Sequence, residues 1–152
     1  MESSAAPARI LVVANQTAAT PALVEAVRER AQAGPATFTL LVPNTTHGLH
    51  RVVDPEDQSH READDTLAQA LPLLEEAAGG HVDGMVGVPE PLAAIQDAIN
   101  LHGFDEVILS TLPARVSRWL KLDLPSKVAA LGLPVTTVTA PDRTTTEAGQ
   151  PV

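Results

Sequence analysis

Cysteine and tyrosine are absent from the sequence, and Phe38, Phe104 and Trp119 are its only aromatic residues. Without cysteine the protein has no disulfide bond, thiolate zinc site or thiol nucleophile, which fits a reducing compartment. With so few aromatic side chains, the core must consist of Val, Leu, Ile and Ala. This composition suits helices packed closely against a sheet.

Basic residues are also scarce, with 10 Lys and Arg against 19 Asp and Glu, for a net charge of −9. This excess of negative charge repels a phosphate backbone, and the few cations do not alternate with stacking aromatics, so we expect no binding to nucleic acid. No apolar run approaches the length of about 20 residues that spans a bilayer, and the first residues lack the apolar core of a signal peptide. We therefore expect a cytoplasmic protein without membrane contact.

Short apolar runs alternate with helical patterns along the whole chain. Strands are expected at residues 10–14, 37–42, 82–87, 105–111 and 134–140, and helices at 21–33, 60–78, 91–103 and 124–132. We expect Thr20 to cap the first helix and Pro72 to kink the second. The alternation predicts an α/β fold with a doubly wound parallel sheet, in a single domain over residues 9–140. Residues 1–8 and 141–152 are small, polar and aperiodic, and are expected to be disordered tails.

Three segments carry a resemblance to a known family: ILVVAN at 10–15, VGVPEPLAAIQDAINLHGFDEVILST at 86–111 and LPVTTVTA at 133–140. In order and spacing, residues 9–140 resemble the universal stress protein family. The resemblance implies an adenine-nucleotide α-hydrolase-like fold, a single-domain five-stranded parallel sheet in the order 3-2-1-4-5 with helices on both faces. It also implies a homodimer formed through the last strand, for which the alternative is an ordinary edge strand exposed to solvent.

The location of a binding site follows from the sheet order. Ligands of open parallel sheets bind outside the carboxyl ends of the strands, where the strand order reverses. Here this point lies between the first and fourth strands, so the loops that follow them should form the site. The candidate ligand-binding residues in these loops are Asn15, Thr17, Ser110, Thr111, Arg115 and Ser117.

The loop after the fourth strand lacks the glycines that the resemblance implies. Nucleotide-binding members of the family carry G-x2-G-x9-G-[ST] after the fourth strand, since glycine lets backbone N–H groups approach phosphate oxygens. In this chain Ser110 and Pro113 stand near the first two glycines, and Leu122 or Asp123 near the third. Pro113 also has no N–H to donate.

Two other positions depart from the family pattern. Asn15 replaces the acidic residue that follows the first strand, and Pro43 lies where the second strand would present its backbone to an adenine ring. We therefore predict weak or no ATP binding, with no cofactor required, although ATP or another anionic nucleotide stays a candidate ligand.

Cations take the place of the missing glycines. Arg115, Arg118 and Lys121 lie within seven residues and could hold a small anion by charge-assisted hydrogen bonds. The alternative is that they only offset nearby acidic residues. The neighbouring Trp119 could stack on a base, but a lone indole at a helix start more commonly packs against the core, which is the interpretation we favour.

Metal binding and catalysis have little support in the sequence. A segment between the second strand and the second helix holds His47, His50, Asp54, Glu56, Asp57 and His60. Its histidines lack the i, i+4 helical spacing of a zinc motif, so we interpret it as a solvated loop without metal. No nucleophile elbow or Walker loop is present, and the sequence therefore does not favour an enzyme.

These observations predict a universal-stress-protein-like binding or regulatory module in stress response. Two alternatives stay open. One is an ATP-binding or nucleotide-hydrolysing protein of the same fold, which would turn over ATP with magnesium. The other is a ligand-free structural protein that only dimerises.

Overall fold

A computed structural model describes residues 7–14, 18, 20–43, 55–88, 90–112, 118–121 and 123–139. Residues 55–63, 118 and 121 are described as backbone only. The elements are β1 (Ala8–Val13), α1 (Pro21–Ala33), β2 (Ala36–Pro43), α2 (Pro55–Ala78), β3 (Val82–Gly87), α3 (Pro91–His102), β4 (Glu106–Thr111), α4 (Arg118–Lys121), α5 (Leu124–Ala129) and β5 (Val135–Thr139). Apart from Pro7 and Ala8, the expected tails lie outside the described residues.

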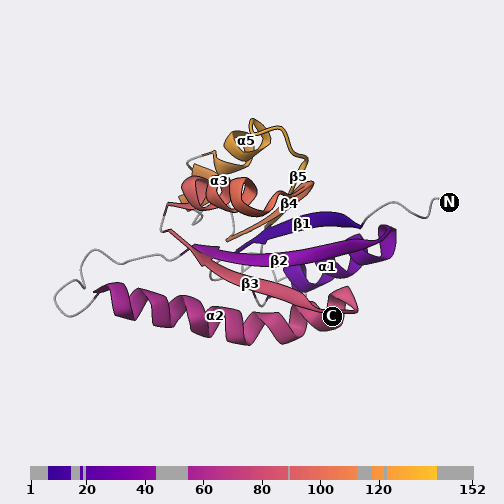
Figure 1. The fold of residues 1–152 in the computed structure, drawn as a ribbon, viewed down its shortest axis with the longest axis horizontal. Coiled ribbons are helices and arrows are strands. Elements are labelled where there is room, and N and C mark those ends of the chain that lie inside the picture. Colours follow the sequence, from indigo (N-terminus) through magenta and orange to yellow (C-terminus); the bar gives the residue numbers. More distant parts are fainter. Residues whose placement is uncertain are drawn as a thin grey trace, which may run out of the picture.

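The described strands form one five-stranded sheet in the order β3-β2-β1-β4-β5. All four pairs of neighbouring strands are parallel. Figure 1 shows α1 and α2 on one side of this sheet and α3 and α5 on the other. The predicted α/β fold, its single sheet and its strand order are therefore confirmed.

Strand β1 lies at the centre of the core because it is apolar on both faces. Ile10 and Val12 pack in the cluster that α1 and α2 cover, whereas Leu11 and Val13 pack in the cluster beneath α3 and α5. Successive side chains of a strand point to opposite faces, so a strand buried on both sides must be apolar at every position. All four side chains are fully buried, which confirms the prediction from this run.

Most helix ends follow the expected signals. Thr20 precedes α1 and Pro21 occupies its first turn, although the Thr20 side chain makes no capping hydrogen bond. At α3 the Glu90 carboxylate accepts a hydrogen bond of 2.8 Å from the Ala93 N–H. Gly103 ends the same helix with φ at +76°, a conformation that glycine adopts without strain.

Two helices differ from the sequence prediction. Helix α2 begins at Pro55, earlier than the expected residue 60, and continues through Pro72 to Ala78. Glu56, Asp57 and His60 therefore belong to helix backbone and not to a loop, since proline suits the first helical turn and acidic residues there complement the helix dipole. His47, His50 and Asp54 lie outside the described residues. The four-residue helix α4 was not predicted, because one turn has no periodicity to detect.

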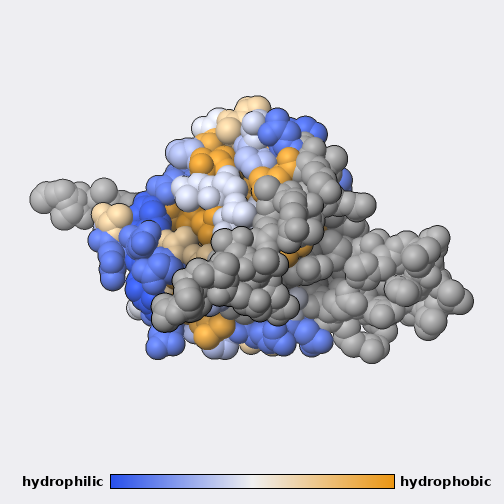
Figure 2. Space-filling model, turned by 180° about the vertical axis from the view of Figure 1, so that it is seen from behind, coloured by the Kyte–Doolittle hydropathy of each residue, from blue (hydrophilic) through white to orange (hydrophobic). Residues whose placement is uncertain are grey.

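One face of the molecule (Figure 2) carries both hydrophilic and apolar residues. On the face shown in Figure 2, hydrophilic residues gather along one side and the lower edge, and apolar residues lie nearer the middle. Large hydrophobic residues that stay exposed within the described part are Leu73, Val88 and Leu101. Among the described helices, none combines the length and the apolar character that crossing a bilayer needs.

Candidate functional site

The strand order reverses between β1 and β4, which lie side by side in the sheet. Val13, the last residue of β1, pairs with Leu109 of β4, so both strands end at nearly the same level. Ala14, directly after β1, is fully buried, and Ser110 and Thr111 at the end of β4 are almost fully buried. The structure thus provides the switch point at which ligands of open α/β sheets bind.

Ser110 and Thr111 point to opposite faces of the sheet, because adjacent residues of a strand alternate. Ser110 lies opposite Val138, which packs with the cluster beneath α1 and α2. The Thr111 hydroxyl donates a hydrogen bond of 3.4 Å to Oγ1 of Thr139 at the end of β5. The structure therefore brings these two predicted residues together through their backbone, whereas their side chains lie on different sides.

Thr139 is a neighbour of the site that the sequence prediction did not include. It pairs with Thr111 in the sheet, and both residues are the last of their strands. Because the predicted fourth and fifth strands are neighbours and parallel, their last residues could have been expected to lie side by side, which would have pointed to Thr139. Its hydroxyl adds a neutral hydrogen-bonding group to this edge of the sheet.

Four predicted site residues, Asn15, Thr17, Arg115 and Ser117, lie outside the described residues, so their contacts stay predictions. The backbones of Arg118 and Lys121 form the ends of α4. Of the predicted site residues, the two that are described, Ser110 and Thr111, offer hydroxyl groups, which bind a ligand by neutral hydrogen bonds. Any charge complementarity would have to come from the loop residues.

Asp123, which follows α4, has a backbone conformation that glycine adopts readily. Asp123, one of the two residues near the position of the family's third glycine, has φ 58° and ψ 41°, the left-handed conformation. Among the described residues it is the only non-glycine residue with a positive φ. Aspartate tolerates this conformation better than most residues. Glycine would adopt this backbone conformation more readily than aspartate does.

Two other interpretations from the sequence can be compared with the structure. Trp119 is half-buried and packs against the cluster beneath α3 and α5, which confirms that its indole is a packing residue. Pro43 ends β2 opposite Gly87 of β3, at the same end of the sheet as the switch point. Within the described ranges, no three His, Cys, Asp or Glu side chains gather in a way that would hold a metal ion.

Comparison with known proteins identifies the fold. No family model matches the chain, and no curated protein matches it in sequence. Solved structures do match. Universal stress protein UspA from Lactobacillus plantarum has a TM-score of 0.63 at 20% identity, with 90% of this chain and 99% of that chain covered.

Two further structures agree in fold and contain nucleotides. A universal stress protein in complex with cAMP has a TM-score of 0.59 at 16% identity, with 88% of this chain and 98% of that chain covered. The universal stress protein from Archaeoglobus fulgidus in complex with dAMP has a TM-score of 0.57, also at 16% identity and with the same coverage. The chain is thus a doubly wound α/β protein with a parallel sheet. Its fold is that of the universal stress proteins.

Proposed function

We propose that the chain is a universal-stress-protein-like binding or regulatory module that acts in stress response in the cytoplasm and binds a small anion at the switch point. The observation that carries this proposal is the switch point itself: β1 and β4 lie side by side and end at nearly the same level, with Ser110 and Thr111 at the end of β4. Structures of the same fold that contain cAMP and dAMP support an anionic ligand.

The proposed contacts are side-chain contacts. Pro113 cannot donate a backbone hydrogen bond, and Ser110 has a Cβ where the family pattern has glycine, so a backbone cradle for a triphosphate is incomplete. Arg115 can instead hold one anionic group through its planar fork of N–H donors. The site then comprises Asn15, Thr17, Ser110, Thr111, Arg115 and Ser117, with weak or no binding of ATP.

The second candidate function is ATP binding, with or without hydrolysis. It is favoured by Asp123, whose left-handed backbone matches what a glycine loop requires at that position. If the loop keeps the course of a phosphate cradle, then the missing glycines reduce the affinity without abolishing the site. This protein would carry a nucleotide through purification and would need magnesium for turnover.

Trp119 gives a direct test, because it is the only tryptophan and lies in α4, close to the candidate loop. Tryptophan fluorescence is followed while cAMP, ATP with magnesium, or pyrophosphate is added. We expect saturable binding of an anion that weakens about tenfold in Arg115→Ala, the loss of one charge-assisted contact. Arg28→Ala is the matched control, since Arg28 lies on α1 and pairs locally with Glu25. Equal binding by Arg115→Ala and the wild type would reject the proposed site.

Mass spectrometry of the freshly purified protein separates the alternatives. A co-purifying ATP, together with release of phosphate in the presence of magnesium, would establish the second candidate. A protein that carries no nucleotide and responds to no anion would be a ligand-free structural protein.

We also propose a homodimer that forms through β5. This strand is one edge of the sheet, with Thr136, Thr137 and Thr139 exposed and Val135 and Val138 half-buried. The Pro134 carbonyl accepts a hydrogen bond from Val107 of β4, and by alternation along the strand the N–H of Thr137 points away from β4. An edge of this kind is open to pairing with a second chain.

Thr137→Pro tests the dimer because it removes an outward N–H and leaves the bonds to β4 in place. In sedimentation velocity we expect a dimer for the wild type and a monomer for the variant. Unchanged circular dichroism shows that the variant is folded. A wild-type monomer, or a folded variant that stays dimeric, would contradict pairing through β5.

A further inference from the structure

A cavity lies at the amino ends of the strands, at the end of the sheet opposite the switch point. It opens on the face that α3 covers, has a volume of about 290 Å³, and is open to solvent on one side. Three neighbouring strands line it, together with His102 and Phe104 at the end of α3. The strand residues that matter for its chemistry are Arg9, Thr37, Thr39 and Asp83.

The cavity arises from a change of polarity along one face of the sheet. Leu11 of β1 and Leu41 of β2 pack in the cluster beneath α3 and α5. Two residues earlier on each strand, and therefore on the same face, stand Arg9 and Thr39. The polar residues thus begin where the apolar cover of the sheet ends, which leaves a recess with a polar floor.

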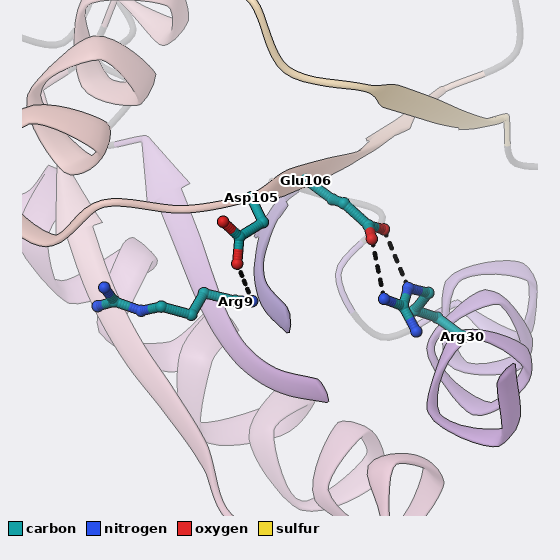
Figure 3. A network of polar contacts seen from close by, with 4 residues as sticks. All are labelled: Arg9, Arg30, Asp105 and Glu106. Carbon is teal, nitrogen blue, oxygen red and sulfur yellow. Dashed lines mark hydrogen bonds and ion pairs between the residues drawn. The ribbon is translucent and has the colours of Figure 1, made fainter. Parts of the chain in front are cut away.

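The backbone of Arg9 is hydrogen-bonded to Asp105, while its guanidinium has no ion-pair partner among the described residues. Its backbone N–H donates to Oδ2 of Asp105 at 2.8 Å, and its carbonyl accepts from the Asp105 N–H at 2.7 Å. The guanidinium lies 5.7 Å from the centre of the Phe104 ring, and Figure 3 shows the side chain extending away from Asp105 and Glu106. It makes no ion pair with any described residue. A guanidinium that stacks on a ring keeps its N–H edge available to an anion.

Asp83 supplies the opposite charge on the far side of the recess. Its Oδ1 lies 2.7 Å from Nε2 of His81, while Oδ2 makes no hydrogen bond to a described residue. In the sheet, Arg9 of β1 lies beside Thr37 of β2, and Asp83 of β3 lies beside Thr39. Arg9 and Asp83 are therefore two strands apart across the sheet and two residues apart along the strand direction. Their Cα atoms are therefore about 12 Å apart. The side chains of both residues line the recess.

We propose that this cavity binds a small zwitterion of amino-acid size, with its carboxylate on Arg9 and its ammonium group on Asp83. The hydroxyls of Thr37 and Thr39 lie between the two charges and can bond to either group. The volume is at the lower limit for ligand pockets, and the carboxylate of Asp83 repels a polyanion such as a nucleotide. This site is independent of the switch point, so either proposal can fail without the other.

The test is a titration of the full chain, labelled with ¹⁵N, followed by amide chemical shifts. L-alanine carries both charges, whereas propionate is alanine without its ammonium group and ethylamine is alanine without its carboxylate. We expect saturable shifts for Arg9, Thr37, Thr39 and Asp83 with L-alanine, and binding at least about tenfold weaker for each single-charge analogue. Absence of saturable shifts with L-alanine, or equal affinity for propionate, would overturn the proposal.

Two variants assign the charges. Arg9→Gln keeps a polar side chain without the cation, and Asp83→Asn keeps the shape without the anion. We expect each to weaken L-alanine binding about tenfold, with the dispersion of the spectrum retained. Arg28→Gln, which removes an arginine from α1 on the opposite face of the sheet, is the control and should bind as the wild type does. Wild-type affinity in both folded variants would exclude this cavity as the site.

Discussion

Arg30 at the end of α1 forms a two-pronged ion pair with Glu106, the first residue of β4. Its Nε donates to Oε1 at 2.9 Å and its Nη2 donates to Oε2 at 2.8 Å. Figure 3 shows the guanidinium facing the carboxylate across the gap between helix and strand. The two residues are 76 positions apart in sequence, so the pair connects the first helix to the strand that carries Ser110 and Thr111.

Removing the cation of this pair should destabilise the fold. Both side chains are partly buried, and paired hydrogen bonds between arginine and a carboxylate are stronger than those of a typical surface ion pair. We expect Arg30→Met to lower the free energy of unfolding by about 1–2 kcal/mol in urea denaturation. Arg28→Met is the matched control, because its i, i+3 pair with Glu25 is exposed and is worth about 0.3 kcal/mol. Equal losses in the two variants would contradict a special role for Arg30.

The same pair predicts a pH dependence. Hydrogen bonds from Arg30 are the main cause that lowers the pKa of Glu106 from its ordinary value of 4.5, while partial burial and the charge of Asp105 act in the opposite direction. Because the pKa is lower in the folded state, the stabilisation is present above 4.5 and is lost as the pH falls through the folded value. The difference in unfolding free energy between wild type and Arg30→Met should therefore shrink between neutral pH and about pH 3. A difference that stays constant over this range would show that the pair does not titrate.

Much of the fold follows from local patterns, and the part that does not has a physical reason. The all-apolar run of β1 predicts a strand buried on both faces, and Pro21 and Gly34 mark the ends of α1. The strand order came from the family resemblance, because periodicity does not say which strands are neighbours. The pair of Arg30 and Glu106 was not predicted, since two charged residues so far apart in sequence carry no local signal.

The place of Ser110 and Thr111 in the fold was predicted from the sequence, whereas their role in binding stays a prediction. The switch-point rule located Ser110 and Thr111 at the end of a buried strand beside β1, where the structure has them. Strand alternation was already sufficient to say that their side chains point to opposite faces. The recess around Arg9 was missed because each of its residues is unremarkable alone, and only the register of three strands brings them together.

Close packing between β3 and α3 predicts the effect of a single methyl group. A Cβ added at Gly87 would lie 2.7 Å from the Cβ of Ala94 and 2.9 Å from Cδ1 of Leu41. Both neighbours belong to the core cluster beneath α3, so they have little room to move. We expect Gly87→Ala to lower the free energy of unfolding by about 1–3 kcal/mol. Gly80→Ala, with no atom within 4 Å, should stay within about 0.5 kcal/mol of the wild type, and a similar loss there would point to a general effect of the substitution.

Two adjacent leucines of α2 differ in burial, so their substitution tests which face of the helix is buried. Leu74 is fully buried in the cluster beneath α1 and α2, whereas Leu73 is 41% exposed. Leu74→Ala leaves a cavity in addition to losing buried apolar surface, so we expect the free energy of unfolding to fall by about 2–4 kcal/mol. Leu73→Ala makes the same chemical change with little cavity and should cost less than about 1 kcal/mol. Urea denaturation of both variants measures the contrast, and a larger loss at Leu73 would mean that α2 presents a different face to the sheet.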